Sequence, residues 1–149
     1  MNESCCGTSK LPIKNATDVT LLITRVIAGV IFAAHGAQKL FGWFGGYGLS
    51  ATVEHMGLLG YPVTIGEFFG GLGLILGILP RFSAASLIVI MIGAIATVHG
   101  KNGFFLSNQG FEYNLALIGL LTPTLLMGTG SLFTVKCFLG KCCKKQQQV

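Results

Sequence analysis

Charged side chains are scarce in this chain: aspartate, glutamate, lysine and arginine make up 10% of its 149 residues, while 52% are hydrophobic. A soluble domain carries about 25% charged residues, because water must solvate most of its surface. The mean hydropathy is strongly positive. The composition therefore excludes a water-soluble globular domain and predicts an integral membrane protein.

The alternation of polar and apolar residues that a membrane β-barrel requires is also missing. Instead, apolar residues follow one another in four segments, which can be compared with the about 20 residues that a helix needs to cross a bilayer. The sequence predicts an all-α membrane protein, a four-helix transmembrane bundle whose last helix is kinked at Pro123. The predicted spans are 19–41, 62–79, 82–99 and 113–133.

Polar residues concentrate at the two ends of the chain. We expect residues 1–17 to form a polar N-terminal segment, 18–134 the membrane domain and 135–149 a basic, cysteine-containing tail. The polar start and Arg25 within the first span do not fit a cleavable targeting signal. The first span is therefore expected to be a retained anchor.

Acidic residues are few, five against ten lysines and arginines. Of the basic residues outside the spans or at their ends, only Lys39 and Lys101 fall on the side away from the termini. The positive-inside rule then predicts cytoplasmic termini and a location in the cell (inner or plasma) membrane. Attraction to anionic lipid explains the positive charge, so nucleic acid is not an expected partner. The basic residues on the terminal side are Lys10, Lys14, Arg81, Lys136, Lys141, Lys144 and Lys145.

Motifs that hold cofactors are lacking. The five cysteines have no C-x-x-C spacing, and on the predicted cytoplasmic side they are not expected to form disulfides. Soft-metal binding, palmitoylation and plain interfacial thiols stay open for them. No haem, flavin or iron–sulfur motif is present, so redox chemistry would need a partner, and no intrinsic cofactor is expected. The cysteines are Cys5, Cys6, Cys137, Cys142 and Cys143.

Ionisable residues inside the predicted spans cost about 3 kcal/mol each on insertion, so each of them requires an explanation. Arg25 shares one helical face with Gly29, Phe32, Gly36 and Lys39, which follow it at offsets of four, seven, eleven and fourteen residues. This face is expected to avoid lipid.

A polar pocket in the outer half of the bundle is predicted from depth. With a rise of about 1.5 Å per residue, His35 and Glu67 both lie roughly 8 Å below the outer boundary, so that the two side chains can meet. His99 ends the third predicted span, but no paired spacing on one helix makes it, His35 and Glu67 a metal site. The candidate pocket residues are Arg25, His35, Lys39, Glu67, His99 and Glu112.

Two interpretations of Glu67 stay open. It is either a buried carboxylate that pins the helices through a hydrogen bond to His35 or Lys39, or a proton-exchanging group beside a quinone or another small ligand. Arg25 lies about 13 Å deeper and is expected near Thr122 and Thr124, with a structural or a functional role.

Glycines are frequent in the second predicted span, so another helix is expected to approach it closely. The loop before it, residues 42–61, contains an amphipathic stretch that is expected to lie over the pocket as an interfacial lid, with Glu54 and His55 facing solvent. The predicted packing glycines are Gly66, Gly70, Gly71, Gly73 and Gly77.

These elements resemble the DoxX family, also called DoxD-like, of small bacterial and archaeal membrane proteins. The matching stretches, from about Leu21 to Leu132, are RVIAGVIFAAHGAQKLFGWFGG, GEFFGGLGLILGILPRFSA, HGKNGFF, EYNLALI and GTGSL. Phe133 departs from the family pattern, which often has an acidic residue there. The resemblance implies a four-helix membrane bundle, and some named members resemble subunits of a thiosulfate:quinone oxidoreductase or membrane parts of redox and stress-response assemblies.

Three functions follow as hypotheses. The first is an accessory membrane subunit of a quinone-linked redox or thiosulfate-oxidising complex, in which Glu67, His35 and Arg25 line a quinone pocket and a partner carries the redox centre. The second is a non-catalytic scaffold or assembly factor, and the third a small-solute carrier. The expected partners are the lipid bilayer together with other membrane or redox-complex subunits, or further copies of this chain.

Overall fold

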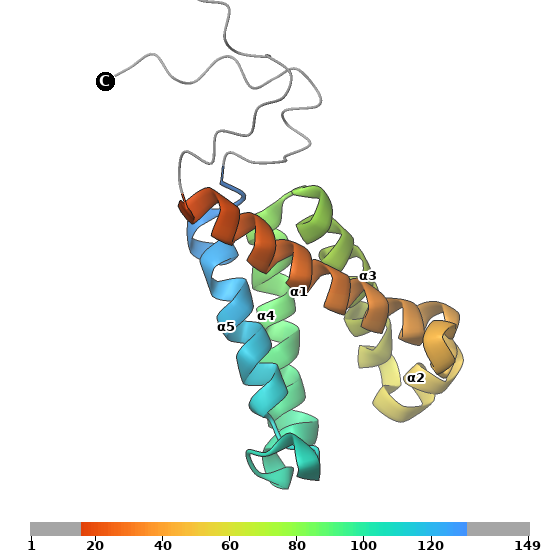
Figure 1. Cartoon of the computed structure of the whole chain (residues 1–149). Helices are drawn as coiled ribbons and strands as arrows, with labels where there is room; N and C mark the ends of the chain where they lie inside the picture. The colour runs from red at the N-terminus through yellow and green to blue at the C-terminus, as the bar shows by residue number, and fades with distance from the viewer. Residues whose placement is uncertain (1–15, 131–149) are drawn as a thin grey trace, which may run out of the picture.

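The computed structural model describes residues 16–130, which form helices and turns and no β-strand. Four of the helices are long and apolar: α1 (Ala16–Phe41), α3 (Gly60–Leu76), α4 (Pro80–Ala94) and α5 (Glu112–Met127). The short helix α2 (Gly48–Met56) connects α1 to α3 (Figure 1). The predicted all-α fold is confirmed for these residues, and the loop predicted to contain a helix contains α2, with Glu54 and His55 exposed. The interfacial lid stays a prediction.

Within residues 16–130, three helical segments are long and apolar enough to cross a membrane: Ala16–Phe41, Trp43–Leu76 and Pro80–Asn102. The fourth, α5, has only 16 residues and ends at Met127, because Gly128 adopts φ 81°, a conformation that breaks the helix. The predicted last span continued to residue 133, and residues 131–133 lie outside the described part, as do all five cysteines. The side of the membrane on which the termini lie stays a prediction.

Glycine and proline place the helix ends a few residues from where hydropathy predicts them. Helix α3 begins at Gly60, and Pro62 lies in its first turn. The first N–H groups of a helix have no partner within the helix, so proline, which has no N–H, fits this position well. It ends at Leu76, because Gly77 takes φ 67°, and the Gly77 N–H donates to the carbonyls of Gly73 and Leu74 in the last turn. Gly77 therefore ends a helix, whereas the sequence placed it among the packing glycines. Helix α4 then begins at Pro80.

One π-helical turn and one 3₁₀ turn continue α4. The turn η3 (Ile95–His99) is π-helical and is followed by the 3₁₀ turn η4 (Gly100–Asn102). The connection to α5 contains one more 3₁₀ turn, η5 (Leu106–Asn108). This end of the bundle, with α2 and residues 95–111, is called the α2 end below, and the opposite end, where α1 begins and α5 stops, is called the terminal end.

The helices pack mainly in two pairs, α1 with α3 and α4 with α5. Figure 1 shows the pairs close together at the terminal end and diverging towards the α2 end. The first pair depends on glycine: a Cβ on Gly71 would lie 2.7 Å from the carbonyl oxygen of Gly29, and one on Gly36 would lie 2.6 Å from the Cα of Phe68. Side chains at these positions would push the two backbones apart.

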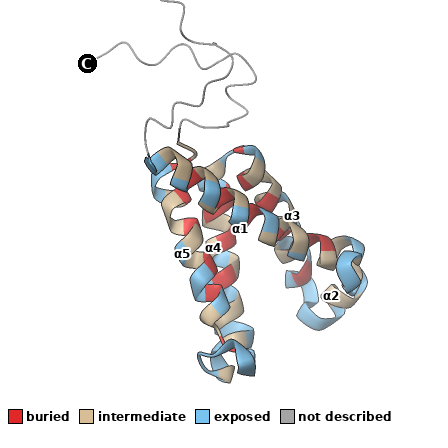
Figure 2. Ribbon diagram, viewed as in Figure 1, coloured by how far each residue is buried: buried red, intermediate tan, exposed pale blue. Residues whose placement is uncertain are grey.

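The other face of α3 packs against α4, and it too is lined by glycine. A Cβ on Gly66 would lie 2.8 Å from Ile90 Cδ1, and one on Gly70 would lie 3.2 Å from Leu87 Cδ2. Figure 2 shows the buried residues on the faces that the helices turn towards one another, while exposed residues gather on α2 and at residues 100–109. The central cluster consists of Ala28, Phe32, Leu74, Ala84, Leu87, Met91, Leu117 and Leu121.

Candidate functional site

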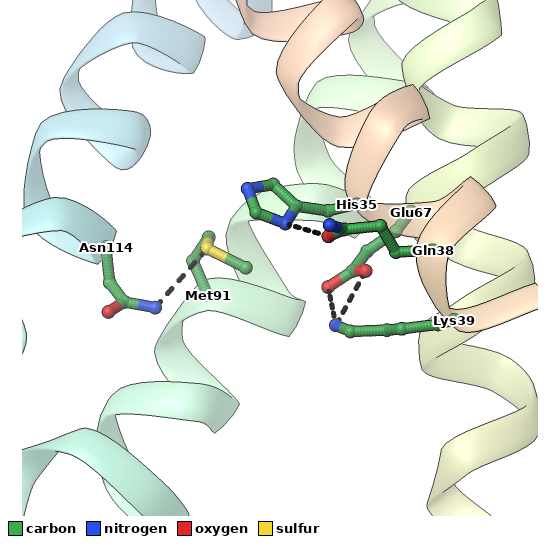
Figure 3. A network of polar contacts seen from close by, with 6 residues as sticks. All are labelled: His35, Gln38, Lys39, Glu67, Met91 and Asn114. Carbon is green, nitrogen blue, oxygen red and sulfur yellow. Dashed lines mark hydrogen bonds and ion pairs between the residues drawn. The ribbon is translucent and has the colours of Figure 1, made fainter. Parts of the chain in front are cut away.

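Lys39 and Glu67 form an ion pair between α1 and α3, towards the α2 end of the bundle (Figure 3). The Lys39 Nζ atom lies 2.7 Å from both carboxylate oxygens of Glu67. Helical spacing puts the two residues face to face. On α3, Thr64, Glu67, Gly71 and Leu74 are buried at intervals of three and four residues. On α1, the face of Arg25, Gly29, Phe32 and Gly36 is buried, as its spacing predicts, and Lys39 continues that face.

The two partners of this pair are buried to different extents. The Glu67 side chain is 4% exposed and that of Lys39 is 32% exposed. A carboxylate held in an apolar bundle loses most of its hydration, and a single ammonium that contacts both of its oxygens is its compensation. Glu67 therefore needs the ion pair to compensate its charge more than Lys39 does, because water still reaches part of the Lys39 side chain.

His35 does not bind Glu67, although the sequence depth placed the two at the same level. Its Nδ1 lies 3.1 Å from Oε1 of Gln38, and its ring meets Tyr113 edge to face at 6.4 Å. Among the described residues no hydrogen bond joins it to Glu67. The reason is rotation: His35 directly precedes the buried Gly36 and is turned by about 100° from it around the helix axis. The imidazole is consequently exposed beside the ion pair and faces α5.

Asn114 is a polar residue that the sequence analysis did not single out. It is 5% exposed, and its Nδ2 donates to the Met91 sulfur at 3.5 Å. A thioether is a weak acceptor, so the buried amide is poorly compensated. Figure 3 shows Asn114 and Met91 on the α4–α5 side, opposite His35 and the ion pair. An asparagine within an otherwise apolar helix was the available signal in the sequence.

Thr64 is a second buried polar residue that the sequence did not indicate. It lies one helical turn before Glu67, is fully buried, and its hydroxyl has no hydrogen-bond partner among the described residues. The sequence offered little to distinguish it, since threonine hydroxyls in membrane helices commonly donate to the carbonyl four residues back. Thr122 does so, donating to the Ile118 carbonyl at 2.8 Å.

His99 and Glu112 lie in the connection between α4 and α5 rather than beside the ion pair. The Nδ1 of His99 lies 2.7 Å from the Gln109 carbonyl oxygen, which also accepts a bond from Asn102. Glu112 begins α5, and its backbone N–H donates to the Phe104 carbonyl. Within residues 16–130, no hydrogen bond or ion pair joins either side chain to Lys39 or Glu67.

Arg25 is completely buried in the half of α1 nearer the terminal end. Its position is ten residues before His35, which corresponds to about 15 Å along the helix. Arg25 therefore belongs to a different level of the bundle from the Lys39–Glu67 pair. Among the described residues, no three His, Cys, Asp or Glu side chains come together in a way that could hold a metal ion.

Comparison with known proteins gives two matches. The DoxX family model matches residues 20–100. A Bacillus subtilis (strain 168) protein named "Putative oxidoreductase CatD" is 35% identical over 122 residues, which cover 78% of this chain and 83% of that protein. No solved structure matches the chain significantly. The region matched by the family model contains most of α1 together with α3 and α4, and thus both residues of the ion pair.

Proposed function

Since the chain belongs to the DoxX family of membrane proteins, we propose that it is an accessory membrane subunit of a quinone-linked redox complex, with thiosulfate oxidation as one such reaction. The name of the Bacillus relative supports a redox setting. The chain itself carries no motif for an electron-transferring group, so a partner subunit supplies the electrons. Reduction of a quinone takes two electrons and two protons and yields a quinol.

The Lys39–Glu67 pair is the observation that carries this proposal. Ionisable groups are costly within a membrane bundle and usually mark a ligand or proton pathway. Lys39 is one-third exposed, and because two of its N–H groups donate to Glu67 it keeps one N–H whose hydrogen bond a quinone carbonyl can accept, while Glu67 holds the ammonium in place. His35 is exposed beside the pair, and the nitrogens of its ring can pass a proton between water and the site. In this arrangement Lys39 orients the headgroup and stabilises negative charge on its oxygen, and His35 delivers protons.

The test uses the complex purified from native membranes in a mild detergent. Glu67→Gln removes the charge that positions Lys39 and should lower quinone-dependent turnover about 100-fold, the scale of displacing a positioned group by about 1 Å. Co-purification of the partner subunit should be unchanged. Glu54→Gln, on the exposed face of α2, is the matched control and should keep full turnover. Wild-type turnover in the Glu67 variant would refute the quinone site.

The scaffold or assembly role is the second candidate, and the packing of α1 on α3 favours it. Gly29, Gly36 and Gly71 bring the two backbones into contact, and the ion pair lies at the end of that contact, where it can lock the helices. A scaffold predicts that Glu67→Gln weakens retention of the partner while turnover per assembled complex stays normal. Solute movement by the purified chain in vesicles would instead favour the carrier hypothesis.

A further inference from the structure

A cavity of about 660 Å³ opens at the terminal end of the bundle, far from the Lys39–Glu67 pair. Its lining consists of Gly77 and residues 79–82, where α3 turns into α4, and of residues 127–130, where α5 ends. All three glycines in the described part of this lining, Gly77, Gly128 and Gly130, have positive φ, so the backbone itself forms much of the wall.

The lining of this cavity is divided into a charged part and an apolar part. Among the described residues that line it, Arg81 is the ionisable one. Leu79, Phe82 and Met127 border it with side chains that are 69%, 72% and 53% exposed. Exposed apolar side chains at the end of a membrane bundle contact acyl chains, whereas a guanidinium at that level meets headgroups. The cavity thus has the polarity of an amphiphile.

The guanidinium of Arg81 has donors to offer. Its Nη2 donates to the Leu126 carbonyl at 3.2 Å, which caps the end of α5 and fixes the side chain across the cavity. A guanidinium carries five N–H groups, and no other hydrogen bond of Arg81 occurs among residues 16–130. Its Nε lies 3.5 Å from where a Cβ on Gly128 would be, so the absence of that side chain leaves the guanidinium bordering the open space.

The guanidinium of Arg81 defines which part of the cavity suits an anion, because it carries the positive charge of the lining. The anion position is therefore at Arg81, next to the exposed side chain of Phe82, which follows Arg81 in α4.

We propose that this cavity binds the headgroup of an anionic glycerophospholipid. The phosphate accepts hydrogen bonds from Arg81, and the acyl chains lie over Leu79, Phe82 and Met127. A soluble anion would make no use of the three apolar side chains, and a zwitterionic lipid would bring its own cation to Arg81. This lipid site is independent of the proposed redox role.

The full chain, purified in neutral detergent, tests this with three probes: phosphatidylglycerol, phosphatidylcholine and inorganic phosphate. Native mass spectrometry should show one retained phosphatidylglycerol, with about fivefold preference over phosphatidylcholine, which is the scale of one arginine at an anionic headgroup. Phosphatidylglycerol should also raise the unfolding temperature, and inorganic phosphate should not. Equal retention of the two lipids, or equal stabilisation by inorganic phosphate, would overturn the proposal.

Variants locate the effect on the molecule. Arg81→Gln should abolish the preference for phosphatidylglycerol, and Lys101→Gln, an exposed cation at the α2 end, should keep it. Because Arg81 also caps α5, Arg81→Lys serves as a second variant, which retains the positive charge but has three N–H donors in place of five. It should keep part of the preference. An unchanged preference in Arg81→Gln, or complete loss in Arg81→Lys with the fold intact, would contradict the site.

Discussion

The unequal burial of Lys39 and Glu67 leads to an unequal response to mutation. Lys39→Met leaves a carboxylate that is 4% exposed without its cation, and breaking a buried pair in this way costs about 3–5 kcal/mol of unfolding free energy. Glu67→Gln leaves an ammonium that is 32% exposed and can extend to water or headgroups, so its cost should be near that of one hydrogen bond, about 1 kcal/mol.

The double variant gives the sharper result. With Lys39→Met already in place, Glu67→Gln removes the uncompensated charge and should restore about 2 kcal/mol, because a neutral buried amide is cheaper than a buried carboxylate. The second substitution should therefore stabilise a protein that the first has weakened. Two independent residues would show additive losses instead.

Reversible unfolding in mixed micelles, with a rising fraction of dodecyl sulfate in a neutral detergent, measures these free energies. Glu54→Gln should change stability by less than about 0.5 kcal/mol and serves as the surface control. Equal losses of unfolding free energy in the two single variants would refute the argument from burial. A double variant that is less stable than Lys39→Met would also refute it.

Two further predictions use the same unfolding assay. Gly36→Ala places a Cβ against the Phe68 backbone and should destabilise the protein by about 1–3 kcal/mol. Gly93→Ala is the control, because open space surrounds that position, and should be neutral or stabilising. Similar losses of stability at both positions would contradict the close α1–α3 contact. Asn114→Leu removes a buried amide whose donor meets only a thioether, and should raise stability by about 1 kcal/mol; a large loss would show that the amide has a stronger partner.

Helical spacing predicted the buried face of α1 correctly, from Arg25 to Gly36, because the residues at the helix contact repeat with the period of the helix itself. Depth along the axis was less informative. It brought Glu67 to the level of His35, yet rotation around α1 turns Lys39 towards Glu67 and His35 away from it. Both coordinates are needed, and the rotation of α3 relative to α1 is set by packing that one sequence does not reveal.

Asn114 and the Arg81 cavity could not be predicted for a related reason. Asn114 depends on which residue of α4 lies opposite, and that residue is Met91. The cavity depends on the end of α5 lying beside the α3–α4 turn, where segments about 50 residues apart meet. The helix ends, by contrast, were readable in Gly77 and Pro80, whose backbone preferences are local, and hydropathy alone obscured them.

The length of α5 has a consequence for the surrounding lipid. Its 16 residues rise about 24 Å, while the hydrocarbon core of a bilayer is about 30 Å thick. Because α5 lies beside α4, whose helical segment continues to Asn102, the two neighbours present different hydrophobic thicknesses to the membrane. Lipids along α5 must compress or tilt. This flank therefore favours thinner bilayers or a neighbouring protein with an equally short helix, which makes hydrophobic mismatch a force for assembly on that side.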